Sequence, residues 1–173
     1  DPMLKGVCVQ MNDTTTIVPA LQRLKNRGVC VVSMLHPAPK EIRVGHAGFD
    51  DAAIGKALAQ ATVQVLGNEG TIMLLHAGID HSCYGPRLWA FDEELRQSTN
   101  LTVLSRIDCQ GKPGNARRII QDKSARYPRL SLWVALDDWP LCTQESRTPA
   151  LPSGFKLVTF SLAPHLWSFV RDG

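Results

Sequence analysis

The sequence lacks the features that mark several classes of protein. No apolar run approaches the roughly 20 residues that a helix needs to span a membrane, and no basic segment followed by an apolar one opens the chain. The net charge of +3 is too small to indicate contacts with nucleic acid. Neither a Gly-x-Ser-x-Gly motif nor a pair of catalytic carboxylates occurs, so nothing in the sequence supports catalysis.

The cysteines do not form a recognisable framework. Their number, five, is odd, which excludes a structure in which all of them pair as disulfides. Cys8 and Cys30 fall in apolar runs and are predicted to pack as small hydrophobic residues. Cys83, Cys109 and Cys142 fall in predicted loops without the CxxC spacing of a thiolate metal site. The sequence therefore predicts neither a bound metal nor a cofactor.

What the sequence does contain begins with residues 5–39, which have the pattern of a βαβ unit. The short apolar runs 6–9 and 29–32 are predicted as strands buried on both faces. Apolar residues recur at helical spacing between them, and Gly28 stands where a left-handed residue ends a helix. Because βαβ crossovers are right-handed, the two strands are expected to be parallel, with a ligand held near their carboxyl ends.

The same alternation continues along the rest of the chain, which is 44% apolar and can therefore bury a core. Helices are predicted at about residues 51–66, 86–97 and 115–126, and strands at about residues 71–75, 101–104, 130–134 and 155–160. The predicted fold class is α/β, with parallel sheets made of repeated βα units.

Six segments also carry motifs in a characteristic order. They are residues 6–13 (strand and N-P-x-D turn), 20–29 (A-x-x-x-A-x-x-x-G-I-P-V), 44–55 (V-G-x-D-N-x-x-x-G), 86–91 (x-R-x-x-G-F), 127–138 (P-D-x-x-x-x-x-x-N-D) and 158–173 (V-V-G-F-D-x-x-P and K-D-G). Together they resemble the type I periplasmic sugar-binding protein family, the ribose-binding-like group that also supplies the effector domains of LacI-type repressors.

This resemblance implies two Rossmann-like lobes with a ligand cleft between them, of which the chain resembles a central segment. Residues 1–49 would form part of an incomplete first lobe and residues 50–160 the second lobe. Residues 161–173 would start the return to the first lobe. The resemblance implies a periplasmic or extracellular receptor that captures a sugar or similar polyol and presents it to an ABC permease.

A sugar site needs planar groups that bind hydroxyls and aromatic rings that cover the apolar face of the sugar. The resemblance places Gln10, Arg87 and Asp138, with Asp137 beside it, at such positions. Arg87 and Asp138 would face one cavity, with Gln10 opposite. The alternatives are that Gln10 bonds to backbone, that Arg87 is a solvated residue at a helix start, and that Asp138 only forms a turn.

Three departures from the family pattern alter the expected site. Leu35 stands where the family has a carboxylate, and His36 follows where arginine is common. The family pair Asn-Asp is here Asp137-Asp138. Trp139 comes next, either as a flat apolar face for the ligand or as a core residue, and the prolines after it predict an irregular segment up to residue 154.

Two other functions stay open on the sequence alone. The chain could be the ligand-sensing domain of a LacI-type transcriptional regulator, which would be cytoplasmic, or of a signalling receptor. It could also be an α/β enzyme that uses the His76, Asp80 and His81 loop. Those side chains are also possible metal ligands, but the sequence has no second cluster that would complete a site.

Overall fold

The chain forms two compact units. The computed structural model describes residues 3–11, 14–78, 83–97, 100–142 and 150–167. Unit 1 comprises Asp1–Asp50 and unit 2 comprises Asp51–Gly173. The assignment of the two units to two lobes that close around a ligand remains a prediction. The segment 161–173, predicted to start the return to the first lobe, is described only as far as residue 167.

Unit 1 is a small parallel sheet with one helix. Strands β1 (Gly6–Gln10), β2 (Cys30–Met34) and β3 (Gly45–Ala47) lie in the order β1-β2-β3, and helix α1 (Thr14–Asn26) connects the first two. Gly28 has a φ of +79°, and the backbone N–H groups of Gly28 and Val29 donate to the carbonyls of Lys25 and Leu24. This is a Schellman motif, so the predicted helix end is confirmed.

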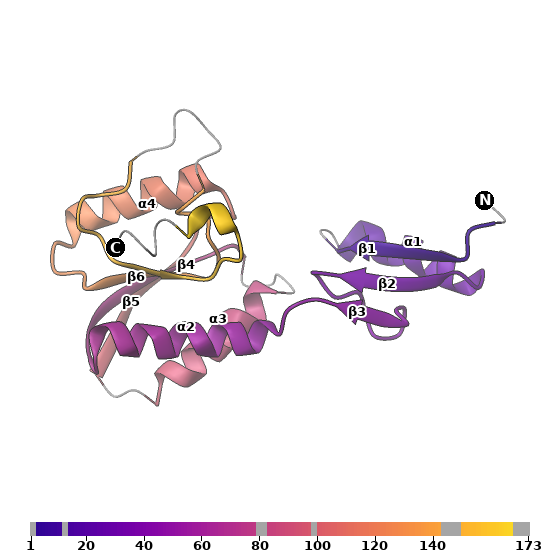
Figure 1. The fold of residues 1–173 in the computed structure, drawn as a ribbon, viewed down its shortest axis with the longest axis horizontal. Helices are drawn as coiled ribbons and strands as arrows, with labels where there is room; N and C mark the ends of the chain where they lie inside the picture. Colours follow the sequence, from indigo (N-terminus) through magenta and orange to yellow (C-terminus); the bar gives the residue numbers. More distant parts are fainter. Residues whose placement is uncertain (1–2, 12–13, 79–82, 98–99, 143–149, 168–173) are drawn as a thin grey trace. The chain divides into compact units, whose positions relative to one another are not determined.

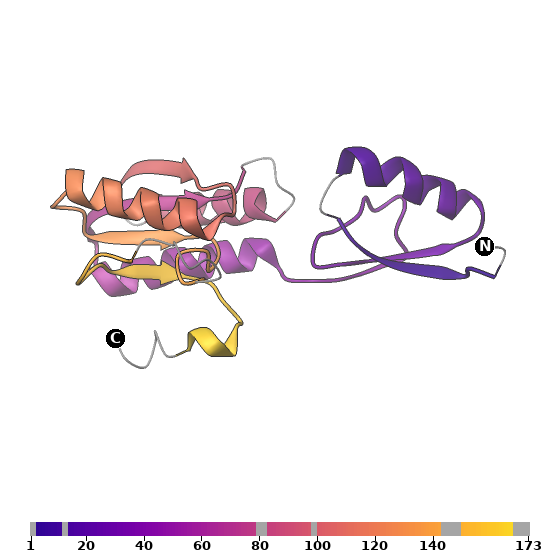
Figure 2. The same ribbon diagram turned by 90° about the horizontal axis from the view of Figure 1, so that it is seen from above.

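The described residues of unit 1 cover the two strands predicted to be buried on both faces on one face only. Helix α1 lies on one side of the sheet (Figure 2), where Leu21 and Val31 are buried. Exposure alternates along β1, and Cys8 and Cys30 are exposed. The prediction that these two cysteines are core residues is therefore wrong for this chain, because no helix of the described part of unit 1 packs on their side.

Unit 2 is a larger parallel sheet with helices on both faces. Its elements are α2 (Asp51–Leu66), β4 (Glu69–His76), α3 (Tyr84–Leu95), β5 (Asn100–Asp108), α4 (Pro113–Arg126), β6 (Leu132–Ala135), β7 (Leu157–Thr159) and the 3-10 turn η1 (Pro164–Leu166). The strand order is β5-β4-β6-β7, and all neighbours are parallel. Helices α2 and α3 cover one face and α4 the other (Figure 1).

The core of unit 2 follows from this layering. The central strands β4 and β6 are nearly continuous apolar runs, as expected of parallel strands enclosed by helices. Their side chains from Ile72 to Leu75 and from Leu132 to Ala135 are at most 2% exposed. The predicted α/β class with parallel sheets is confirmed.

The predicted elements differ from the observed ones mainly at their ends. Helix α2 has the predicted bounds, whereas α3 and α4 each begin two residues earlier, and β5 extends to Asp108. Strand β3 was not predicted, because three residues are too short for a periodic signal.

Part of the predicted irregular segment, residues 143–149, lies outside the described residues; the described parts on either side contain no helix. No helix in the described part of the chain is long and apolar enough to cross a membrane.

Candidate functional site

The topology of unit 2 marks one edge of its sheet as the candidate ligand site. From β4 the chain passes through α3 to β5 on one side, and it then returns through α4 to β6 on the other side of β4. Open α/β sheets bind ligands where the strand order reverses in this way, beyond the carboxyl ends of the strands. Here that point lies between β4 and β6. The predicted residues Arg87, Asp137, Asp138 and Trp139 all follow these two strands.

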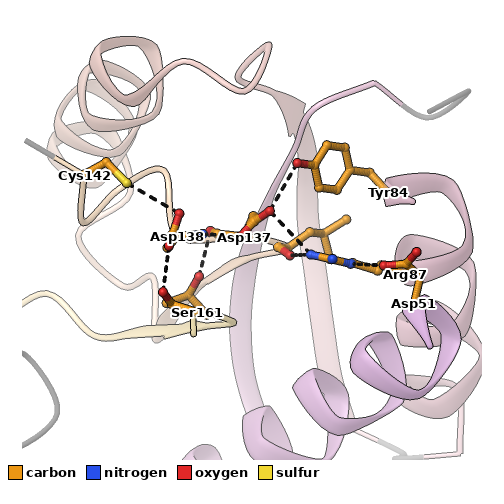
Figure 3. Close-up of polar contacts among 9 residues, drawn as sticks. Asp51, Tyr84, Arg87, Asp137, Asp138, Cys142 and Ser161 are labelled. Carbon is orange, nitrogen blue, oxygen red and sulfur yellow. Dashed lines mark hydrogen bonds and ion pairs between the residues drawn. The ribbon is translucent and has the colours of Figure 1, made fainter. Parts of the chain in front are cut away.

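Arg87 is a buried residue of the first turn of α3. It is 4% exposed, so the alternative of a solvated helix-start residue is wrong. Its Nε donates to Asp51 Oδ1 at 2.7 Å, and its Nη1 donates to the carbonyl of Leu136 at 2.8 Å. Nη1 also lies 3.5 Å from Asp137 Oδ2 (Figure 3). The guanidinium therefore joins the start of α2 to the end of β6.

Two further features fix the position of Arg87. Its guanidinium carbon lies 5.4 Å from the ring centre of Tyr84 and 5.1 Å from that of Phe160, within cation–π range. Gly55 of α2 is buried against the backbone of Arg87, and a Cβ there would overlap the Arg87 carbonyl. The glycine thus allows α2 and α3 to approach closely, which brings Asp51 within reach of the arginine.

Asp137 faces this arginine. Its Oδ2 accepts a hydrogen bond from the Tyr84 hydroxyl at 3.1 Å, and its Oδ1 accepts one from the backbone N–H of Asp138 at 3.0 Å. Burial raises the pKa of Asp137, while that N–H and Arg87 oppose the shift. Burial and the charge of Asp137 raise the pKa of Tyr84, so this hydroxyl stays protonated as a donor.

Asp138 points the other way (Figure 3). Its Oδ2 accepts a hydrogen bond from Ser161 Oγ at 2.7 Å, and its Oδ1 accepts one from Cys142 Sγ at 3.4 Å. Burial, followed by the charge of Asp138, raises the pKa of Cys142 to about 11, so the thiol stays neutral. The structure therefore brings Arg87 into contact with Asp137 rather than with Asp138. The expectation that Arg87 and Asp138 face one cavity stays a prediction.

Trp139 is mostly enclosed. It is 7% exposed, belongs to the hydrophobic core of unit 2, and meets Tyr84 edge to face with ring centres 5.0 Å apart. This placement matches the core alternative for Trp139. A contact between its ring and a ligand stays a prediction.

The other predicted residues lie at the carboxyl ends of β1 and β2 in unit 1. Gln10 is exposed, and its side chain makes no hydrogen bond with the described residues. Leu35 is 39% exposed with a φ of +60°, a conformation that is uncommon for residues other than glycine. His36 is half-buried, with Nδ1 3.1 Å from the carbonyl oxygen of Met11. The binding roles of these three residues remain predictions.

The residues of the alternative enzyme or metal site are only partly described. His76 ends β4, and burial lowers its pKa. Its Nδ1 is buried and has no hydrogen-bond partner among the described residues. Asp80 and His81 lie outside the described residues. In the described ranges, no three His, Cys, Asp or Glu side chains come together as a metal site.

The sequence reasoning missed four residues that complete the cluster around Arg87 and Asp138, namely Asp51, Tyr84, Phe160 and Ser161. Asp51 had a usable signal, because it stands at the asparagine of the V-G-x-D-N-x-x-x-G motif. Phe160 and Ser161 had a similar signal, because they stand at the phenylalanine and aspartate of the V-V-G-F-D-x-x-P motif, whereas Tyr84 of α3 had none.

A parallel α/β unit with charged and aromatic side chains at its switch point has the form of a ligand-binding domain. The sequence model of the periplasmic binding protein domain matches residues 3–143, and the chain belongs to this family. No curated protein matches the sequence significantly.

Solved structures show the same fold. An ABC transporter solute-binding protein of Burkholderia graminis in complex with D-arabinose superposes with a TM-score of 0.83 at 13% identity, over 98% of this chain and 60% of the other. GanP, a glucose-galactose binding protein from Geobacillus stearothermophilus, gives a TM-score of 0.70 at 16% identity, over 78% of this chain and 48% of the other. A solute-binding protein from Actinobacillus succinogenes with bound D-allose gives a TM-score of 0.72 at 13% identity, over 80% of this chain and 52% of the other. The chain thus spans about half to three fifths of these relatives.

Proposed function

We propose that the chain is part of a solute-binding protein of an ABC-type importer that captures a sugar or similar small polyol. The observation that carries the proposal is the position of Arg87 and Asp137, which meet at the topological switch point of a periplasmic binding protein fold. The solved structures that support it are those of solute-binding proteins with D-arabinose, D-allose and D-fucose bound.

The chemistry of the cluster suits hydroxyl groups. Arg87 uses Nε and Nη1 within the protein, and Nη2 makes no hydrogen bond with the described residues. The carboxylate-bearing side chain of Asp137 is 25% exposed. A hydroxyl that accepts from Nη2 and donates to Asp137 would make two charge-assisted hydrogen bonds, each worth about 1.5–3 kcal/mol.

The remaining parts of the proposal follow from the family. The first lobe, to which unit 1 would contribute Gln10, Leu35 and His36, would close over the ligand and exclude water. The partner would be an ABC permease and the location the periplasm or the outer face of the cell. The ligand would be bound without being converted, which separates this function from that of an α/β enzyme.

The proposal is tested with the complete gene product. Thermal melting and calorimetry are run against D-arabinose, D-allose, D-fucose, D-galactose, D-glucose, D-ribose and D-xylose, with linear polyols as additional ligands. A ligand that binds only the folded state raises the melting temperature. At least one sugar or polyol is expected to do so and to be recovered unchanged. No binding by any of them, or conversion of one, would overturn the proposal.

A further inference from the structure

We infer that Asp51 is a positioning residue that neutralises Arg87, and that the site therefore takes neutral or amine-bearing sugars and excludes anionic ones. The inference rests on the proposed function and deepens it. An arginine at a ligand site ordinarily indicates recognition of a carboxylate or phosphate, because its planar fork matches their oxygens. The surroundings of Arg87 point to the opposite preference.

The charge of Arg87 is already compensated within unit 2. Its Nε lies 2.7 Å from Asp51 Oδ1, and the two side chains are only 5% and 10% exposed. Because little water reaches this pair, the attraction between its charges is weakly screened. Arg87 is also held by the Leu136 carbonyl and between two aromatic rings. The guanidinium cannot turn towards an anion without leaving Asp51 buried and unpaired, which is costly.

The charged groups that contact Arg87 are both negative, namely Asp51 and Asp137. The other partners of Asp137 are a neutral hydroxyl and a backbone N–H. Among the described residues, no cation other than Arg87 forms an ion pair with Asp51 or Asp137. The second buried guanidinium of unit 2, Arg117, donates to the Pro140 carbonyl and lies near Cys142. Around Arg87, one guanidinium thus contacts two carboxylates.

This balance decides which ligands fit. A neutral hydroxyl donates to a carboxylate and accepts from Arg87 Nη2 without adding charge. An ammonium group would add attraction to Asp137. A ligand carboxylate or phosphate would be desolvated next to Asp137, and among the described residues only Arg87, already paired with Asp51, contacts that carboxylate. Such like-charge contacts are strongly unfavourable at an interface.

Matched sugar derivatives test the inference at pH 7. D-galacturonate is compared with D-galacturonamide, and D-glucuronate with D-glucuronamide, because each amide has the shape of its acid without the charge. Galactosamine and glucosamine are measured as the positively charged ligands. Affinities are measured by calorimetry, or by competition with the sugar that binds best in the neutral panel. The wild-type protein is expected to bind the amide more than about tenfold tighter than the acid.

The variant Asp51→Asn separates charge from position, because its amide oxygen still accepts the hydrogen bond from Arg87 Nε. D51N is expected to reduce the ratio of amide to acid affinity by about tenfold while neutral sugars still bind. Asp92→Asn is the matched control, since Asp92 pairs with Arg106 on a more exposed part of α3 and β5. D92N removes the same charge and is expected to leave the ratio unchanged.

The outcomes distinguish the inference from the function on which it rests. An acid that binds the wild-type protein as tightly as its amide would overturn the inference, as would a folded D51N with an unchanged ratio. If D51N does not fold, the wild-type ratio alone decides. Failure of every neutral, cationic and anionic sugar to bind would instead overturn the proposed function, and the inference with it.

Discussion

The two units have the same alternation of strands and helices, and they differ in how completely helices cover the sheet. Unit 2 has helices on both faces of its sheet, and its central strands are buried. The described part of unit 1 has one helix, and one face of its sheet is exposed at Cys8, Cys30 and Met34. The difference also separates the candidate site residues: those of unit 2 form a connected network, whereas Gln10 and Leu35 of unit 1 are exposed.

In the proposed function, unit 2 is therefore expected to supply a preorganised half of the binding site. Its charged groups are already oriented by buried partners, so a ligand would not have to order them. The side chain of Gln10 in unit 1 is exposed and makes no hydrogen bond with the described residues, so a ligand would have to order it. We therefore expect substitutions in the network of unit 2 to change stability as well as binding, and substitutions in unit 1 to change stability little.

The largest effect is expected for Arg87→Ala. This change leaves Asp51 and Asp137 without their cation in a buried setting, and breaking a buried pair costs about 3–5 kcal/mol. Urea unfolding measures the loss. The control is Arg106→Ala, which breaks a more exposed pair with Asp92 and is expected to cost about 0–1 kcal/mol. Equal losses in the two variants would show that the Arg87 network does not stabilise unit 2.

A smaller effect is expected for Gly55→Ala. The added methyl group would overlap the Arg87 carbonyl, so α2 and α3 would have to separate. Such overpacking costs about 1–3 kcal/mol. Gly45→Ala in unit 1 is the control, because nothing lies within 4 Å of a Cβ at that position. If urea unfolding gave the same midpoint for both variants, the close approach of α2 and α3 would not position the site.

The smallest effect concerns pH. Burial raises the pKa of Asp137 above its ordinary value of 3.8, so the folded chain binds more protons there than the unfolded chain. This group contributes stability that is fully present below its ordinary pKa and is lost as the pH rises through its raised value. The unliganded wild-type protein should therefore lose stability, relative to Asp137→Asn, between pH 4 and the raised pKa. A constant difference between the two unfolding free energies would contradict the assignment.

The fold could be predicted from the sequence because local patterns determine it. The apolar runs of β4 and β6 and the glycine at position 28 each carry their own signal. The exposure of β1 could not be predicted, since an apolar run does not reveal whether a second helix covers it. The partners of the site were equally hidden. Arg87 was found through its motif, but its pairing with Asp51 could not be predicted, because it depends on how α2 packs against α3.

The central claim is that a sugar binds at the carboxyl ends of β4 and β6, and titration of Asp137→Asn tests it most directly. Asparagine keeps the size of Asp137, and its amide oxygen can still accept from the Asp138 N–H, so the variant is expected to fold. The measurement is calorimetric titration with the best-binding sugar of the panel, beside Asp122→Asn on the exposed side of α4. D137N is expected to weaken binding by more than about tenfold, through the loss of a charge-assisted hydrogen bond, while D122N does not. Equal affinities for the wild-type protein and a folded D137N would contradict the claim.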